Sequence, residues 1–296
     1  MEIVNEIAKK TTEIDQIVEK YLPKEEGLSH RLIEAMNYSI HAGGKRLRPM
    51  LMFETYHMFG GKSEVIEPFM AAIEMIHTYS LIHDDLPAMD NDEYRRGQKT
   101  THIAYGEAEA ILAGDGLLNL AYETALMALD IEPANHNVGK ALQILAKKAG
   151  IYGMVGGQAV DVETDKTQSV SKEQLDYIYH LKTGALIESS MLIGAVLAGA
   201  TKSEQQMVEQ AATQIGLAFQ IQDDILDITS TTEVLGKPVG SDEKNQKATY
   251  VTYEGMEKAK ADVNSYSSQA VENLKSLVVK NEFLVALTEY LIHREK

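Results

Sequence analysis

The sequence predicts an all-α protein: a single large helical bundle that spans residues 1–296. Composition is the first observation, because proline occurs only six times, tryptophan never, and aromatic residues make up 6% of the chain. Such a composition favours helices over sheets. The second observation is that apolar residues recur at helical spacing along most of the chain, with no strand-like alternation and no Pro/Ser-rich linker. A chain of this length can bury a sizeable core.

The helices can be placed in order. Residues 2–22 carry Ile3, Ile7 and Ile14 at helical spacing, and Pro23 follows as a stop. The same periodicity predicts helices over 28–41, 63–86, 106–129, 135–152, 171–199 and 203–230, and two or three more up to the C-terminus. Gly153–Asp161 is rich in small residues, so it is a place for close helix packing or for a ligand.

Charge and hydropathy exclude several classes of function. The formal net charge is −16, from 28 basic and 44 acidic residues, which disfavours nucleic acid and anionic lipid as partners. The longest apolar run, Met191–Ala200, is too short to span a bilayer, so no stable membrane association is expected. The polar, amphipathic N-terminus is unlike a secretory signal, and the absence of cysteine fits a reducing compartment. A cytoplasmic protein is expected.

An acidic cluster ends an apolar stretch within Glu74–Gly97. Asp84, Asp85 and Asp90 are followed by the pair Arg95–Arg96. Carboxylate oxygens are the ligands that Mg²⁺ prefers, usually together with substrate phosphates, and arginine binds phosphate oxygens in a bidentate manner. The stretch therefore predicts a site for a magnesium-chelated phosphate ester.

The spacing of this cluster makes a structural prediction. Asp84 and Asp90 are six residues apart, about 240° around an ideal helix. Pro87 lies between them and disfavours helix continuation. If both aspartates bind the same metal cluster, the helix must end near Leu86–Pro87 and bring Asp90 back toward Asp84.

A second acidic cluster occurs in Phe219–Asp227. Asp223 and Asp227 are four residues apart and lie on one helix face, with Gln220 beside them and Asp224 adjacent. Bare carboxylates at this spacing repel one another, which favours a bound cation. An ordinary amphipathic helix with an acidic outer face is the alternative.

Basic residues and a histidine complete the chemical pattern. Gly43–Pro49 places Lys45 and Arg48 in a glycine-opened turn where both can converge on one anion, although a solvated basic loop is the alternative. His77 lies seven residues before Asp84 on nearly the same face; a satisfied core histidine is the alternative. His83 has a weaker claim. Lys182 and Lys237 are further cationic candidates, so two diphosphate groups can be held at once.

These motifs, taken together and in order, resemble the trans-isoprenyl diphosphate synthases, and most closely the bacterial farnesyl-forming members. The resemblance spans nearly the whole chain and rests on GGKRLRP, DDLPAMD with its downstream RRG, GMVGGQAVD, KTG, FQIQDDILD and GKPVGSDEKNQKATY. It implies an all-helical fold with a deep central cavity, a homodimer, and two to three Mg²⁺ ions per subunit. The implied substrates are isopentenyl diphosphate and dimethylallyl or geranyl diphosphate.

The resemblance also implies roles for single residues. Metal ligands would be Asp84, Asp90 and Asp223, with Asp85, Asp224 and Asp227 completing the motifs. The allylic diphosphate would be held by Arg95, Lys182 and Lys237, with Thr183 and Gln220 facing the reacting carbons. Isopentenyl diphosphate would be held by Lys45, Arg48, His77 and Arg96, and a basic tail through Arg294 would close over the site.

The expected reaction is a head-to-tail condensation that yields farnesyl diphosphate, and Tyr79 with its neighbour Ser80 is the candidate for chain-length control. Tyr79 lies five residues before Asp84, about 7.5 Å down the helix, where its ring can floor the cavity. A merely packed aromatic is the alternative. The prediction is that Tyr79→Ala lengthens the product beyond fifteen carbons.

Four other functions compete with this hypothesis. A geranylgeranyl or longer-chain synthase differs only in pocket depth. A class I terpene cyclase usually replaces the second acidic motif with an Asn/Ser/Glu pattern, whereas this chain has DDILD. A non-catalytic regulatory subunit of a synthase typically loses one aspartate motif, and both are intact here. An acidic bundle that merely binds divalent cations leaves GGKRLRP and GKPVGSD unexplained.

Overall fold

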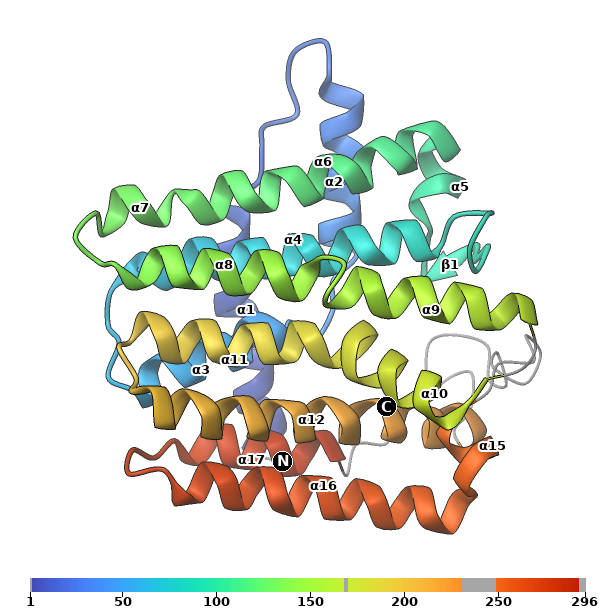
Figure 1. The fold of residues 1–296 in the computed structure, drawn as a ribbon. Coiled ribbons are helices and arrows are strands. Elements are labelled where there is room, and N and C mark those ends of the chain that lie inside the picture. Colours follow the sequence, from blue (N-terminus) through green and yellow to red (C-terminus); the bar gives the residue numbers. More distant parts are fainter. Residues whose placement is uncertain (1, 168–169, 230–248, 293–296) are drawn as a thin grey trace. The chain divides into compact units, whose positions relative to one another are not determined.

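A computed structural model describes residues 2–167, 170–229 and 249–292. Within these residues every regular element is a helix except for one hairpin of two-residue strands (Figure 1). The predicted all-α class is therefore confirmed.

The elements follow one another with short connections. Up to residue 131 they are α1 (Glu2–Glu19), α2 (His30–His41), α3 (Leu47–Met58), η1 (Glu64–Ile66), α4 (Glu67–Asp84), β1 (Tyr94–Arg95), β2 (Gln98–Lys99), α5 (Thr101–Tyr105), α6 (Glu107–Leu126) and α7 (Ala128–Ile131). The remaining ones are α8 (Asn137–Ala149), α9 (Met154–Thr167), α10 (Lys172–Ile178), η2 (Tyr179–Gly184), α11 (Ala185–Leu197), α12 (Lys202–Thr229), α15 (Tyr250–Glu254), α16 (Met256–Ser276) and α17 (Glu282–Ile292).

The chain divides into two compact units. The amino-terminal unit comprises Glu6–Met50 and Ser63–Val138, and the carboxy-terminal unit comprises Met1–Asn5, Leu51–Lys62 and Gly139–Lys296. The two predicted aspartate motifs lie in different units, and each motif is described within its own unit.

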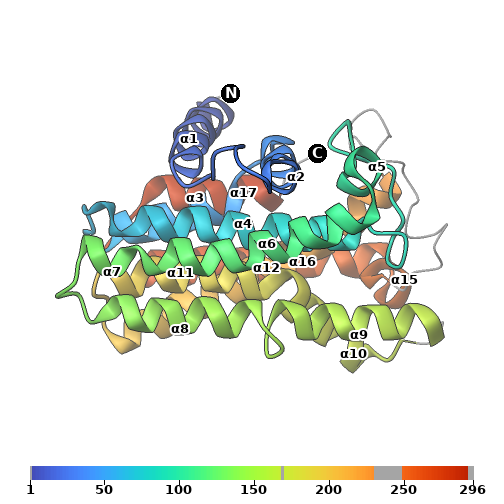
Figure 2. The same cartoon turned by 90° about the horizontal axis from the view of Figure 1, so that it is seen from above.

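The amino-terminal unit is built on the pair of helices α4 and α6, which lie side by side in both views (Figures 1 and 2). Ser63 caps η1 by accepting a hydrogen bond from the Val65 amide, and Pro68 occupies the first turn of α4, where its missing amide costs nothing. The segment Glu64–Asp84 is long and apolar enough to cross a bilayer, but 78% of its most apolar window is buried inside the protein, as in a core helix. A rigid, buried helix thus carries the first aspartate motif at its C-terminal end.

The carboxy-terminal unit packs α11, α12 and α16 against one another (Figure 1). All thirteen residues of α11 are buried, which explains why this stretch is apolar on every face. Ser171 with Gln174 forms a capping box at α10, and Thr249 with Thr252 forms one at α15. The second aspartate motif lies near the C-terminal end of α12.

Two features differ from the sequence prediction. The helix expected over 171–199 is interrupted by η2, a π-helical segment. One extra residue in a single turn shifts the apolar periodicity too little to be recognised in the sequence. The hairpin was not predicted either, since its strands are too short to show alternation. Its two-residue loop has positive φ at Arg96 (54°) and Gly97 (77°), as a type I′ turn requires.

Candidate active site

The first aspartate motif lies where α4 ends. Asp84 is the last helical residue and Asp85 is the C-cap. The chain then turns, so that the Asp90 amide donates a 2.9 Å hydrogen bond to the Asp84 carbonyl. The helix does end just before Pro87, as its missing N–H and its ring require, and the predicted return of Asp90 toward Asp84 is confirmed.

The second aspartate of this motif has a different environment from the first. Asp85 is 3% exposed, and its carboxylate accepts hydrogen bonds from Arg95 Nε at 2.8 Å and Arg95 Nη2 at 2.6 Å. Arg95 lies on β1, and Asp92 Oδ2 is 3.7 Å from the same guanidinium. This bidentate pair fixes the hairpin to the end of α4. Asp84 is half-buried and Asp90 is exposed.

His77 lies two turns before Asp84 on α4. Burial lowers the pKa of His77 well below its usual value, and the positive charges of Arg48, Arg96, Arg95 and Arg46 lower it further. The imidazole is therefore neutral at pH 7 and serves as a hydrogen-bonding group rather than a cation. Arg48, His77 and Arg96, three of the residues predicted to bind isopentenyl diphosphate, thus belong to the same unit and influence one another through their charges.

Arg96 connects the hairpin to the glycine-opened turn. Its Nη1 donates to the Gly43 carbonyl, and a Cβ atom added at Gly44 would lie 2.7–2.9 Å from the guanidinium. Gly44, with φ of +145°, is favoured by the backbone conformation, and a side chain here would also displace the Arg96 guanidinium. A small pocket of about 30 Å³, enough for one water molecule, is lined by Asp85, Arg95 and Arg96 together with residues of α2 and α4.

Tyr79 packs between α4 and α6, below the aspartates. Its ring meets His83 edge-on, with centroids 5.7 Å apart and an interplanar angle of 84°. Gly114 on α6 leaves room for the His83 ring, since an added Cβ would overlap it. Burial raises the pKa of Tyr79 to about 12, so the phenol is neutral. Ser80 donates to the His77 carbonyl at 2.9 Å. The role of both residues in chain length stays a prediction.

In the carboxy-terminal unit, η2 carries Lys182 and Thr183. Two glycines allow other helices to approach this segment closely: an added Cβ would lie 2.3 Å from the Lys182 amide nitrogen at Gly157 and 2.9 Å from the Gly184 Cα at Gly216. The Gly153–Asp161 stretch therefore serves close helix packing, which was one of its two predicted purposes. A π-helical segment places side chains at angles that a regular helix cannot, and such segments are frequent at functional sites.

Both predicted η2 residues have defined partners. Lys182 Nζ pairs with Asp161 of α9 at 2.5 Å. The Thr183 hydroxyl donates to Gln220 Oε1 at 2.6 Å, and Gln220 Nε2 donates to Asp224 Oδ1 at 3.2 Å. A continuous chain of hydrogen bonds thus links the π-helical segment to the second aspartate motif.

Asp224 is an acceptor inside the protein. It is 3% exposed and accepts hydrogen bonds from the Tyr179 hydroxyl and, at 2.7 Å, from the Tyr250 amide. Tyr250 in turn donates to Asp262 at 2.7 Å. Asp223, by contrast, is exposed, and Asp227 one turn later is buried. The acidic patch of α12 is therefore divided between solvent and interior, unlike an ordinary acidic outer face.

Lys237 and Arg294 lie outside the described residues. Five structurally important residues escaped the sequence prediction: Asp161, Arg46, Glu74, Tyr179 and Tyr250. Only Glu74 had a usable signal, because an isolated acid in the middle of an apolar helix implies a buried basic partner.

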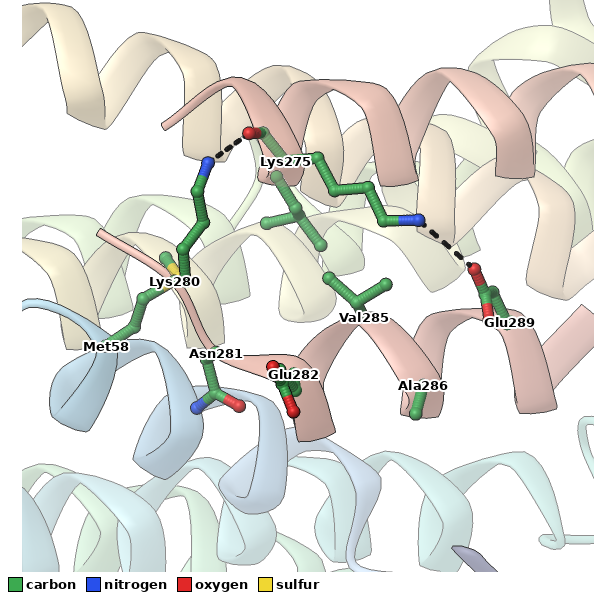
Figure 3. Close-up of a pocket in the computed structure, with 9 residues that line it drawn as sticks. Met58, Lys275, Lys280, Asn281, Glu282, Val285, Ala286 and Glu289 are labelled. Atoms are coloured by element: carbon green, nitrogen blue, oxygen red, sulfur yellow. Dashed lines mark hydrogen bonds and ion pairs between the residues drawn. The ribbon is translucent and has the colours of Figure 1, made fainter. Parts of the chain in front are cut away.

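A larger pocket lies in the carboxy-terminal unit. It has a volume of about 290 Å³ and lies between α16 and α17 (Figure 3). Lys280 donates to the carbonyl groups of Lys275 and Leu277, and Lys275 lies 3.7 Å from Glu289. None of the predicted site residues lines this pocket.

Comparison with known proteins identifies the family. Residues 29–283 match the family described as polyprenyl synthetase. The chain belongs to the polyprenyl synthetase family. It is 43% identical over 284 residues to the farnesyl diphosphate synthase of Geobacillus stearothermophilus, covering 95% of this chain and 94% of that protein. It is also 43% identical over 281 residues to the geranylgeranyl diphosphate synthase of Cyanophora paradoxa, covering 95% and 93%.

A solved structure supports the same assignment. The geranyltransferase of Helicobacter pylori, crystallised with magnesium and isoprenyl diphosphate, superposes with a TM-score of 0.84 at 29% identity, covering 99% of this chain and 97% of that one. The predicted family is confirmed, and this polyprenyl synthetase is a prenyltransferase of isoprenoid biosynthesis.

Proposed function

We propose that this prenyltransferase condenses isopentenyl diphosphate head-to-tail with dimethylallyl and then geranyl diphosphate, yielding (2E,6E)-farnesyl diphosphate. The observation that carries the proposal is the end of α4, where Arg95 and Arg96 line one pocket together with Asp85 and where Asp90 returns to Asp84. A cluster of arginines beside exposed carboxylates suits a substrate whose diphosphate is bound partly by basic groups and partly through a divalent cation.

Magnesium fits the residues present. Among the residues that the structure describes, no group of three or more His, Asp or Glu side chains forms a complete metal site. Mg²⁺, however, is usually held by one or two carboxylates plus substrate phosphates and water. The turn that brings Asp90 back to Asp84 places two such carboxylates at one helix end, and Asp223 offers another in the carboxy-terminal unit. We propose two to three ions per subunit, held by Asp84, Asp90 and Asp223.

The chain's own residues have clear tasks in the reaction. The allylic C–O bond breaks with its electron pair leaving on the diphosphate, and Lys182, Arg95 and Lys237 stabilise that negative charge. Asp161 holds the Lys182 ammonium in place. Mg²⁺, when bound, supplies additional charge stabilisation to the departing diphosphate.

The allylic cation needs negative dipoles and the exclusion of water. Gln220 Oε1 and Thr183 Oγ1 are 2.6 Å apart and form an oxygen pair suited to this purpose. The double bond of isopentenyl diphosphate attacks the cation, forming the new carbon–carbon bond. This attack leaves the positive charge on the isopentenyl part. The carbon next to that charge loses a proton to the released diphosphate, and the electrons of the broken C–H bond form the new double bond.

Assembly as a homodimer is part of the proposal. Large apolar side chains remain exposed along α6 and α7, namely Ile111, Leu112, Leu126, Met127, Leu129 and Ile131. Large apolar side chains left exposed in this number on two consecutive helices favour a protein–protein interface. Sedimentation equilibrium should give twice the 32.7 kDa chain mass; a monomer at micromolar concentration would contradict the dimer.

One assay tests the activity and the product. The purified protein is incubated with Mg²⁺, isopentenyl diphosphate and either dimethylallyl or geranyl diphosphate, and the products are sized by chromatography. A C15 product is expected. A C20 product would favour the geranylgeranyl synthase whose name also occurs among the relatives, and the absence of elongation would refute the enzymatic proposal.

Tyr79 supports the C15 product, because its buried ring below Asp84 would stop the growing prenyl chain of the product from extending further along α4. Replacing Tyr79 by Ala should lengthen the product beyond fifteen carbons, whereas Tyr79→Phe keeps the ring and should leave the C15 product unchanged. An identical product profile for both variants would remove Tyr79 from chain-length control.

A further inference from the structure

The turn between α2 and α3 has a backbone that needs support. Gly43 and Gly44 have positive φ, and so does Arg46, at 46°. An arginine rarely adopts this left-handed conformation, so the surrounding structure must hold it there. Lys45 immediately precedes this strained position, and Arg48 follows two residues later as the second residue of α3.

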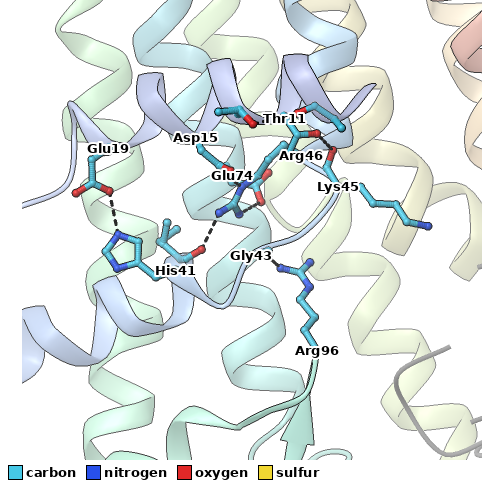
Figure 4. A network of polar contacts seen from close by, with 12 residues as sticks. Thr11, Asp15, Glu19, His41, Gly43, Lys45, Arg46, Glu74 and Arg96 are labelled. Carbon is cyan, nitrogen blue, oxygen red and sulfur yellow. Dashed lines mark hydrogen bonds and ion pairs between the residues drawn. The ribbon is translucent and has the colours of Figure 1, made fainter. Parts of the chain in front are cut away.

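Arg46 is held from one side by three hydrogen bonds (Figure 4). Its Nε donates to Asp15 Oδ1 at 2.7 Å, Nη1 to Glu74 Oε1 at 2.7 Å, and Nη2 to the Ile40 carbonyl at 2.8 Å. The Arg46 side chain is 4% exposed and that of Glu74 is 2% exposed. A buried carboxylate on an apolar helix requires such a partner, and the planar guanidinium satisfies α1, α2 and α4 simultaneously.

The same turn is held from the other side by Arg96, which donates to the Gly43 carbonyl. Thr11 Oγ1 adds a 3.4 Å hydrogen bond to the Lys45 carbonyl. Figure 4 shows the Lys45 side chain pointing away from the Arg46 guanidinium. The turn is thus fixed at the Gly43 carbonyl, the Lys45 carbonyl and the Arg46 side chain, while the Lys45 side chain extends away from the Arg46 guanidinium.

We propose that Arg46, through its buried pair with Glu74, is a positioning residue for isopentenyl diphosphate. It touches no substrate. It stabilises the left-handed turn and thereby fixes the positions of Lys45 before it and Arg48 after it, so that both can bind the diphosphate. This inference rests on the function proposed above.

The test uses the full-length protein and the variant Arg46→Lys, which keeps the charge but replaces three directed donors by one flexible ammonium. The KM for isopentenyl diphosphate should rise at least about tenfold. The kcat at saturating isopentenyl diphosphate and the KM for geranyl diphosphate should stay within about twofold. Amide hydrogen exchange over 43–47 should become faster than in the wild type.

Two further variants keep the test decisive. Val65→Ala is the control for a general loss of stability. Val65 is buried in η1, just before α4 and away from the turn, so its truncation should lower the melting temperature without changing the turn. Glu74→Gln retains an oxygen acceptor for Arg46 and should give a smaller KM increase than Arg46→Lys; it replaces Arg46→Lys if that variant fails to fold.

The outcomes separate this inference from the proposed function. An unchanged KM for isopentenyl diphosphate in Arg46→Lys, or an equal rise in Val65→Ala, would overturn the positioning role. If the wild type produces no prenyl diphosphate, the proposed function fails. The positioning role of Arg46 is then tested by the dissociation constant for inorganic diphosphate. Equal binding by the wild type and Arg46→Lys would overturn this role, and weaker binding by the variant would support it.

Discussion

In both aspartate motifs of this polyprenyl synthetase, one aspartate of the Asp–Asp pair is accessible and the other is buried, but the buried aspartate is held by different kinds of partner. In each, the second aspartate of the Asp–Asp pair is 3% exposed, whereas the first is accessible. Asp85 is fixed by a charged partner, Arg95, at the end of a helix. Asp224 is fixed within a continuing helix by neutral donors, the Tyr179 hydroxyl, the Gln220 amide and the Tyr250 backbone. Adjacent carboxylates therefore serve two purposes: one is available for a ligand, and the other holds the scaffold.

The largest expected effect concerns the accessible aspartates. Asp84→Ala and Asp223→Ala should each lower kcat by about 10³-fold or more, because each removes a carboxylate proposed to hold magnesium against the developing charge. The far-ultraviolet circular dichroism and the melting temperature should remain those of the wild type, since neither side chain is fully buried. Loss of helical signal in either variant would instead make that aspartate a structural residue.

The buried aspartate of the first motif should behave in the opposite way. Asp85→Asn leaves the Arg95 guanidinium facing a neutral amide, and it should lower the free energy of unfolding by roughly 1.5–3 kcal/mol. Asp84→Asn is the matched control one residue earlier and should change stability by less than about 0.5 kcal/mol. Urea denaturation of both variants measures the difference, and equal stabilities would end the proposed division of labour in this motif.

The neutral anchor of the second motif should be weaker. Tyr179→Phe removes the hydroxyl that donates to Asp224 and should cost roughly 1–2 kcal/mol of stability. Tyr177→Phe, on the same helix but 43% exposed, is the control and should be neutral. If the two variants unfold at the same urea concentration, the Tyr179 hydroxyl does not stabilise Asp224.

The smallest expected effect is a pH dependence from His77. The pKa of His77 in the folded protein lies well below the unfolded value of about 6.5. Below pH 6.5 the unfolded state therefore binds a proton at His77 that the folded state does not bind. Stability is therefore fully present above pH 6.5 and falls as the pH decreases below it, by about 1 kcal/mol between pH 6.5 and 5.5. His77→Gln should remove this part of the slope. An unchanged slope of unfolding free energy against pH would show that His77 is not the group responsible.

Sequence reasoning reached those features that rest on local chemistry. Pro87 required the helix to end after Asp84, and the observed Asp90–Asp84 hydrogen bond follows from that requirement. The positions of most helices followed from their apolar periodicity. What could not be read was the pairing between segments far apart in the chain. Asp85 and Asp84 have the same side chain, and only the tertiary contact with Arg95 gives Asp85 its different role. Similarly, no local pattern distinguishes Arg46 from Lys45 and Arg48 in GGKRLRP, although the structure pairs Arg46 with the buried carboxylate of Glu74.

The hairpin and the π-helical segment escaped prediction for a related reason. Each is shorter than the window over which periodicity can be measured. The type I′ turn at Arg96–Gly97 nevertheless directs the side chains of two neighbouring arginines to different partners. Arg95 donates to Asp85, and Arg96 donates to the Gly43 carbonyl.

The π-helical segment Tyr179–Gly184 has a consequence for how this chain tolerates changes in length. A π-turn contains one more residue than the regular turn that it replaces, so it is equivalent to a single-residue insertion within an otherwise continuous helix from Lys172 to Leu197. Deleting one residue here would restore the regular helix without breaking it. The part before the deletion would then rotate by about 100° relative to α11, carrying Tyr179 away from Asp224. At this position a helix with more regular local geometry would therefore lose the hydrogen bond that Tyr179 donates to Asp224.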